Sequence, residues 1–141
     1  MKKSLLVTLA LLMVIGACSL AMADENKSAS RVIAYYFHGT FRCYTCTDME
    51  KYSREGIETN FKDALASGSL EFKAVNVEDR GNEHFVNDYQ LYTKSLILSL
   101  VKDGKEIKHK NLDQIWQLAR NKEKFIAYVT GEVTELLKDV K

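Results

Sequence analysis

The apolar residues of this chain form short runs that alternate with helical stripes. The run VIAYYF at Val32–Phe37 is β-branched and aromatic, which predicts a strand. LEFKAVNV at Leu70–Val77 predicts a second strand, and the nearly all-apolar LILSLV at Leu96–Val101 predicts a buried central strand. Asp103–Gly104 is a strong hairpin signal that leads into KEIKHK, Lys105–Lys110, as an edge strand.

Helical patterns separate and follow these strands. From Cys43, apolar residues spaced by four and eight predict a helix with a possible bend at Gly56 and a C-cap at Gly68. A short helix is predicted within 78–92. After Asn111, an expected N-cap, the rest reads as helix, with a buried stripe of Phe125, Val129, Val133, Leu136 and Val140. This order predicts one α/β domain with a mixed four-stranded sheet and helices on both faces.

The N-terminus has the pattern of an export signal. A basic start precedes the apolar run Leu5–Gly16, which is shorter than the ~20 residues that a membrane-spanning helix needs and fits the ~7–15 residues of a signal's hydrophobic region. Ala21–Ala23 is a small-x-small cleavage site, whereas IGAC at Ile15–Cys18 resembles a lipoprotein box that would lipidate Cys18. We leave both open and expect a periplasmic or cell-envelope protein, with a membrane tether if Cys18 is used.

The predicted division is therefore a signal segment over 1–23, a flexible polar tether over 24–31 and a folded domain over 32–141. Removal of 1–23 leaves 18 basic and 19 acidic residues. A near-neutral surface gives no electrostatic reason to expect nucleic acid as a partner, since that calls for a basic patch or stripe.

The candidate chemistry lies in FHGTFRCYTC, Phe37–Cys46, where two residues separate two cysteines. Covalent haem attachment needs a histidine after the second cysteine, and Thr47 stands there. Structural zinc wants four ligands, and only His38 is close enough in sequence to add one. A disulfide across two residues closes a very short loop and would add little stability. A redox pair is favoured, because the motif opens a helix within a βαβ pattern.

This placement assigns a role to each cysteine. The positive end of the helix and the neighbouring Arg42 favour Cys43 as a thiolate, the reactive form. Cys43 would attack a disulfide or electrophile, and the more buried Cys46 would resolve the mixed intermediate. Phe41 and Tyr44, on the loop and motif, are candidates for contacting a partner protein or substrate.

The element order together with CYTC resembles the thioredoxin-like superfamily in a short form without the first strand and helix, over about residues 31–140. The chain contains no proline, so the cis-proline that faces the cysteines in that superfamily is missing. The resemblance aligns Lys94 with that position, which implies a trans peptide there, and it makes Lys94 and Ser95 substrate contacts. The superfamily's buried acid is replaced by Tyr36 or Phe37, so that proton handling would pass to His38.

Two longer motifs, YYFHGTFRCYTC and NVEDRGNEHFVNDYQLYTKS, are similar to the exported family named as a nitrophenyl-compound nitroreductase subunit (ArsF). This resemblance implies a role in reducing nitroaromatic arsenicals together with a protein partner. We expect no bound cofactor, because the chain has no Gly-rich phosphate loop. Two functions stay open: an electron-relay thiol–disulfide oxidoreductase, and a carrier that binds As(III) or Cu(I) through Cys43 and Cys46.

Overall fold

The computed structural model describes residues 30–140, so the predicted signal segment, Cys18 and residues 24–29 of the tether lie outside the described part. Its elements, in chain order, are β1 (Arg31–His38), α2 (Tyr44–Asn60), α3 (Lys62–Ala66), β2 (Leu70–Asn76), α4 (His84–Asp88), β3 (Ser95–Lys102), β4 (Lys105–Asn111), α5 (Ile115–Leu118) and α6 (Lys122–Leu137). No helix within 30–140 is long and apolar enough to cross a membrane.

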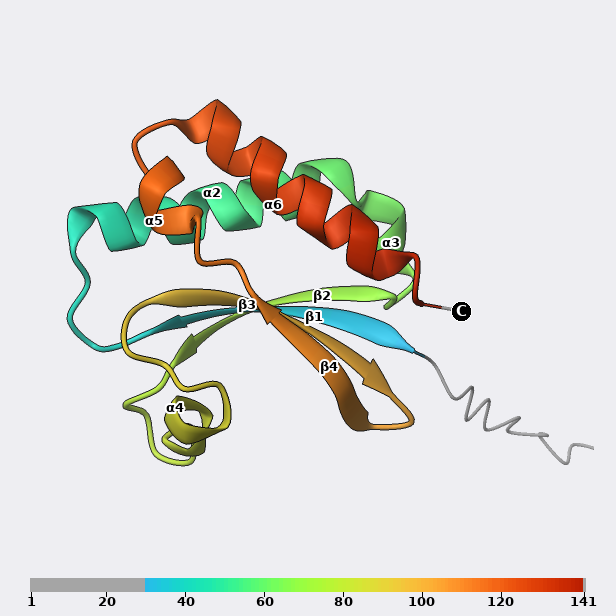
Figure 1. The fold of residues 1–141 in the computed structure, drawn as a ribbon, viewed down its shortest axis with the longest axis horizontal. Helices are drawn as coiled ribbons and strands as arrows, with labels where there is room; N and C mark the ends of the chain where they lie inside the picture. The colour runs from blue at the N-terminus through green and yellow to red at the C-terminus, as the bar shows by residue number, and fades with distance from the viewer. Residues whose placement is uncertain (1–29, 141) are drawn as a thin grey trace, which may run out of the picture.

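The four strands form one mixed sheet in the order β2-β1-β3-β4. β1 runs parallel to β2 and antiparallel to β3, and β3 runs antiparallel to β4. Helices α2, α3, α5 and α6 cover one face, and the short α4 lies against the other (Figure 1). The predicted α/β class, mixed sheet and two-sided helical cover are confirmed.

Strand alternation divides the core between the two faces. Tyr36 points toward α2, whereas its neighbours Tyr35 and Phe37 stack with each other on the α4 face. The larger core lies under α2 and α6, where apolar side chains from strands and helices are almost fully buried: Val32, Ala34, Met49, Ile57, Leu70, Leu96, Leu98, Leu100, Leu112, Phe125, Val129 and Val133. The α6 stripe is thus confirmed from Phe125 to Leu136; Val140 lies beyond the end of the helix and packs at the margin.

Two helix boundaries differ from the predicted ones. The helix after Cys43 is interrupted at Phe61 instead of bending at Gly56. A Cβ on Gly56 would lie 3.3 Å from a methyl carbon of Ile126, so this glycine serves the close approach of α2 to α6. Asn111 ends β4 and is no cap; Asn121 caps α6 by accepting the Lys124 amide at 3.0 Å.

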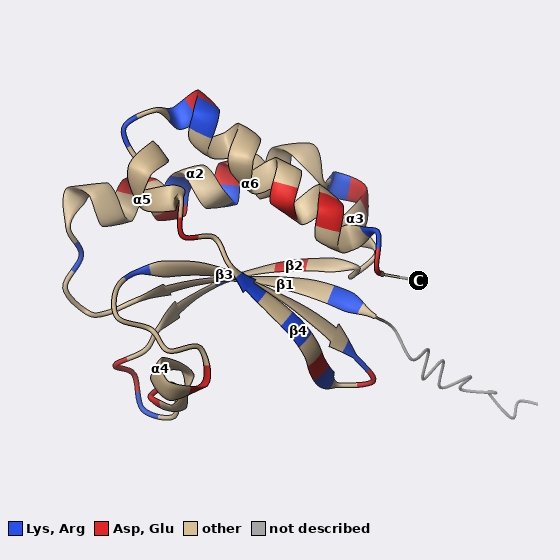
Figure 2. Ribbon diagram, viewed as in Figure 1, with Lys and Arg blue, Asp and Glu red and all other residues tan. Residues whose placement is uncertain are grey.

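The DG hairpin between β3 and β4 is present. Asp103 and Gly104 both have positive φ, 52° and 74°, as a tight hairpin turn requires. β4 is exposed along its length, and on the helical side Lys108 and Lys110 pair with Asp139 and Glu132. Figure 2 shows acidic and basic residues interspersed over β4 and α6.

On the α4 face, Glu106 is the centre of a polar network. Its carboxylate accepts hydrogen bonds from the buried Ser99 hydroxyl, the Tyr89 hydroxyl and the His109 ring. Burial alone would raise the pKa of Glu106, but these hydrogen bonds outweigh it and hold the pKa below its usual value. The network ties edge strand β4 to β3 and to the residue that follows α4.

Candidate functional site: a cysteine pair at the start of α2

Cys43 and Cys46 form a disulfide at the N-terminus of α2, with their Cα atoms 5.0 Å apart. Cys43 is the N-cap, in extended conformation, and its sulfur accepts the Cys46 amide at 3.1 Å. Cys46, in the first turn, is only 1% exposed, whereas Cys43 is partly exposed. The difference in exposure agrees with Cys43 as the sulfur that meets a partner.

The local sequence explains why the pair sits at this point. The central strand β1 ends at His38, and the loop that follows carries the chain from the end of this strand to the start of α2 (Figure 1). Thr47 then fastens the first turn: its amide donates to the Cys43 carbonyl at 3.0 Å and its hydroxyl does so at 3.2 Å. The free amides at the start of this 17-residue helix give the site a partial positive charge.

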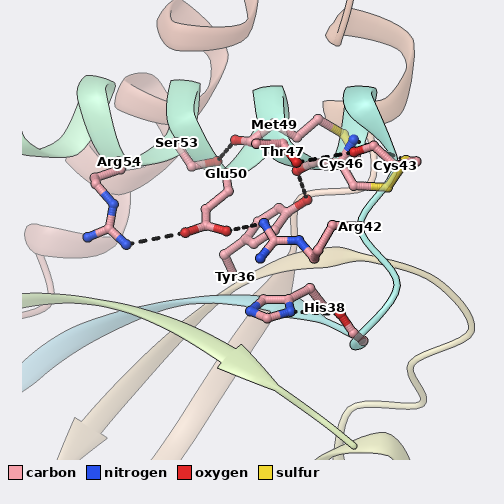
Figure 3. A network of polar contacts seen from close by, with 11 residues as sticks. Tyr36, His38, Arg42, Cys43, Cys46, Thr47, Met49, Glu50, Ser53 and Arg54 are labelled. Atoms are coloured by element: carbon pink, nitrogen blue, oxygen red, sulfur yellow. Dashed lines mark hydrogen bonds and ion pairs between the residues drawn. A yellow bond between two sulfur atoms is a disulfide. The ribbon is translucent and has the colours of Figure 1, made fainter.

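Tyr36 lies directly beneath the cysteine pair (Figure 3). Its hydroxyl donates to the Cys46 carbonyl at 2.6 Å, and the side chain is fully buried. Burial raises the pKa of Tyr36 well above its usual range, against a smaller lowering by Arg42, so the phenol stays protonated. Tyr36 therefore holds the first turn of α2 to the sheet through a neutral hydrogen bond.

Arg42 bonds a carboxylate on α2. Its guanidinium forms an ion pair with Glu50, which also accepts a hydrogen bond from Arg54 at 3.3 Å (Figure 3). The Arg42 Nε is buried and has no hydrogen-bond partner within residues 30–140. Arg42 directly precedes Cys43 in the sequence, and in the structure its charge is balanced by Glu50.

His38 ends β1 below the loop and is half-buried. Its Nδ1–H donates to the Gly39 carbonyl at 3.0 Å. Together with Lys94 it lines a small hollow of about 150 Å³ that also includes Glu78. Hydrogen bonds from Thr40, its backbone amide first, lower the pKa of Glu78, with smaller contributions from Lys94 and His38.

The loop before β3 carries the other two predicted contact residues. The Lys94 carbonyl accepts the Trp116 indole N–H at 3.0 Å, and the Ser95 hydroxyl is turned back onto the Thr93 carbonyl at 3.0 Å. Ser95 is buried. Every peptide bond of the described chain is trans, so the trans peptide expected at Lys94 is confirmed.

Aromatic side chains near the pair are strongly exposed. Phe41 is 76% and Tyr44 85% exposed, and Tyr92, in the loop before Lys94, is 94% exposed. Single exposed apolar side chains are normal on protein surfaces, so this exposure makes the three rings accessible to a partner but does not by itself mark a binding surface. Phe41 and Tyr44 were expected from the sequence as contact residues; Tyr92 was missed, because a tyrosine in a predicted helical segment carries no signal of its own.

Glu50 and Trp116 are further neighbours of the site that the sequence did not single out. Glu50 had a weak signal: it lies four residues after Cys46 and four before Arg54, the spacing of contacts on one helical face. Nothing in the sequence joins Trp116 to Lys94. In the described chain no three His, Cys, Asp or Glu side chains gather as a metal site would require.

The comparisons with known proteins are distant. No protein-family model matches the chain, and no curated protein matches it. It is similar to a solved structure described as that of a malarial protein, with 17% identity, 64% of this chain and 94% of the other covered, and a TM-score of 0.39.

Two thioredoxins are similar to a comparable degree. That of Fasciola hepatica is 20% identical over 67% of this chain and 81% of its own, with a TM-score of 0.36. That of Trypanosoma brucei brucei is 19% identical over 71% and 78%, with a TM-score of 0.38. With TM-scores below 0.5, these likenesses carry no argument about this chain.

The fold class rests on the chain's own topology. A βαβ unit begins with β1, its helix α2 starts at a Cys-x-x-Cys pair, and an antiparallel hairpin and a final helix complete the sheet. The domain therefore has a thioredoxin-like α/β fold, with the bonded Cys43–Cys46 pair at the start of the helix in its βαβ unit.

Proposed function

We propose that this protein is a thiol–disulfide oxidoreductase that passes electrons to or from a partner protein through Cys43 and Cys46. One observation carries the proposal: the two sulfurs are bonded at a helix N-terminus, with Cys43 partly exposed and Cys46 buried. A helix N-terminus favours the thiolate of the residue that caps it. The exposed Phe41 and Tyr44 supply apolar surface for a partner.

In the reducing direction, the Cys43 thiolate attacks one sulfur of the substrate disulfide. A mixed disulfide forms, and the other substrate sulfur leaves as a thiolate and takes up a proton. The Cys46 thiol then loses its proton and attacks the Cys43 sulfur, which restores the Cys43–Cys46 disulfide and releases the second substrate thiol. Two electrons pass to the substrate. The oxidising direction is the same sequence in reverse.

The setting we propose is an exported system that reduces nitroaromatic arsenicals. This part rests on the resemblance of two long motifs to the ArsF family and on the signal pattern of residues 1–23. The protein would serve as the electron-relay subunit, and the nitro chemistry would take place on its partner. Export, by either cleavage route, would place the cysteine pair in a compartment where disulfides persist.

A trapping experiment tests the exchange step. Cys46→Ser leaves Cys43 free to attack but removes the resolving thiol, so it should accumulate a mixed disulfide with a model disulfide substrate. Cys43→Ser, the matched control, keeps only the buried sulfur and should trap none. Equal trapping by the two variants, or none by either, would refute the proposal.

The metalloid-carrier function remains the second candidate, because two adjacent sulfurs at one exposed helix end form a ready chelate for a thiophilic ion. Reduced protein titrated with a trivalent arsenical, Cu(I) and Zn(II) separates the two functions. Stoichiometric arsenic or copper binding without any mixed-disulfide formation would favour the carrier. Exchange activity without binding would favour the relay.

A further inference from the structure

The strongest feature that the exchange mechanism leaves unused is the ion pair between Arg42 and Glu50. Arg42 immediately precedes Cys43, and an unpaired guanidinium there would strongly favour the thiolate. Instead the guanidinium is held by Glu50, on the second turn of α2. Glu50 is mostly buried, with 19% of its side chain exposed.

We propose that Glu50 is a positioning residue that sets the reactivity of Cys43, by holding Arg42 and offsetting its positive charge. The inference rests on the proposed thiol chemistry of Cys43. It goes beyond that chemistry by assigning control of the nucleophile to a residue outside the Cys-x-x-Cys motif. Figure 3 shows the arrangement, with Glu50 between the two arginines.

Three features support this assignment. Glu50 binds both Arg42 and Arg54, so its carboxylate is held in one place. Arg42 leaves its Nε buried and without a partner in the described chain, although buried donors are nearly always satisfied. An unsatisfied donor such as the Arg42 Nε–H lowers stability, and such unfavourable features are expected at functional sites. Tyr36 lies within electrostatic reach of both charges, since Arg42 lowers and Glu50 raises the pKa of its hydroxyl.

The size of the effect follows from the distance along the helix. Cys43 and Glu50 are seven residues apart, which at 1.5 Å per residue is about 10 Å. At an effective dielectric of ~20–40, one charge at ~10 Å shifts a thiol titration by about half a unit to one pH unit. Removal of the Glu50 charge should therefore make Cys43 reactive at lower pH.

The test is the pH profile of Cys43 alkylation by iodoacetamide in the reduced full-length protein, read by mass spectrometry. Glu50→Gln should lower the pH midpoint by about half a unit to one unit. Arg42→Gln, which leaves the Glu50 charge in place, should raise it. The double variant should return close to the unsubstituted protein, because both charges are gone.

Glu58→Gln is the matched control. Glu58 pairs with the same Arg54 at 3.5 Å, but it lies 15 residues from Cys43, roughly 22 Å along the helix. Its side chain is 55% exposed, so salt screens its charge far more than that of the mostly buried Glu50. The pH midpoint of Cys43 alkylation should therefore not change in Glu58→Gln. Far-UV circular dichroism and urea midpoints show whether each variant is folded.

Opposite shifts for Glu50→Gln and Arg42→Gln would support the inference. Shifts in the same direction would overturn it, because general loosening of the loop would then be the cause. A Glu50→Gln shift no larger than that of Glu58→Gln would overturn it too. Alkylation does not require a partner disulfide, so failure here is distinguishable from failure of the trapping experiment.

Discussion

A hydrogen bond from the Tyr36 hydroxyl to the Cys46 carbonyl joins strand β1 to the Cys-x-x-Cys motif. The substitution Tyr36→Phe removes this hydrogen bond and no other. The phenylalanine ring keeps the buried apolar contacts of the tyrosine. Because Cys46 lies in the first turn of α2, its carbonyl keeps a partner in the helical ladder, so the substitution orphans no acceptor. The substitution therefore measures one buried hydrogen bond of 2.6 Å.

We expect a loss of about 1 kcal/mol in the free energy of unfolding, within the ~0.5–1.5 kcal/mol that a typical intramolecular hydrogen bond contributes. For a domain of about 100 residues this is a fall of roughly 4 °C in Tm. In urea, with a slope of ~2 kcal/mol per M, the midpoint should fall by roughly 0.5 M. The slope itself should not change, since the fold is kept.

Urea unfolding of the oxidised protein, followed by circular dichroism, is the assay. Tyr35→Phe is the control, because Tyr35 is the next residue of β1, lies on the opposite face and makes no hydroxyl hydrogen bond to any residue from 30 to 140. Tyr35→Phe should lower the free energy of unfolding only slightly. The reasoning fails if Tyr36→Phe is as stable as the unsubstituted protein, or if both variants lose the same amount.

Three further predictions test the rest of the fold. Glu106→Gln should lower the free energy of unfolding at pH 7 by roughly 1–2 kcal/mol. Because the pKa of Glu106 is lower in the folded than in the unfolded protein, the carboxylate stabilises the fold above its unfolded pKa, and this contribution is lost as the pH falls through its folded pKa. The urea midpoints of the variant and of the unsubstituted protein, measured from pH 6 to pH 3, should therefore converge. Trp116→Phe should cost about 0.5–1 kcal/mol and speed hydrogen exchange around Lys94, whereas unchanged exchange would mean that the indole does not hold this loop. Asn121→Ala should cost ~1 kcal/mol as a lost N-cap, and Asn111→Ala should cost clearly less; the reverse order in thermal melts would contradict the assignment of the cap.

Strand patterns and turn chemistry predicted most of the architecture. VIAYYF and LILSLV became adjacent strands of the sheet, and the Asp103–Gly104 turn has the positive φ values that its sequence predicted. Cys43 became a helix N-cap followed by one long amphipathic helix. These are local features, in which side-chain shape and backbone preference act in the same direction.

The errors lie where local signals compete or are lacking. Asn111 and Asn121 are equally good cap residues in isolation, and the pairing of Asn111 with Ile97 in the sheet decides between them. The break at Phe61 has neither proline nor glycine to mark it. Tertiary packing determines both the position of the helix cap and the break at Phe61, and the spacing of apolar residues in the sequence does not reveal that packing.

The candidate site could be predicted in its chemistry but not in its surroundings. The spacing of Cys43 and Cys46, and which of them is the more buried, followed from the motif opening a helix. The position of Arg42 in sequence indicated a charge beside Cys43, but its partner Glu50 depends on how the loop folds back over α2. Side-chain pairing across a loop is a long-range property, so only the structure supplies it.

The central claim is that Cys43 and Cys46 form a working redox couple. Equilibrating the protein with glutathione buffers of graded potential and counting free thiols tests it directly. The account predicts a single two-electron transition with a midpoint between about −270 and −120 mV, the span of known thioredoxin-like exchangers. A pair that stays fully oxidised or fully reduced across the whole series would contradict it.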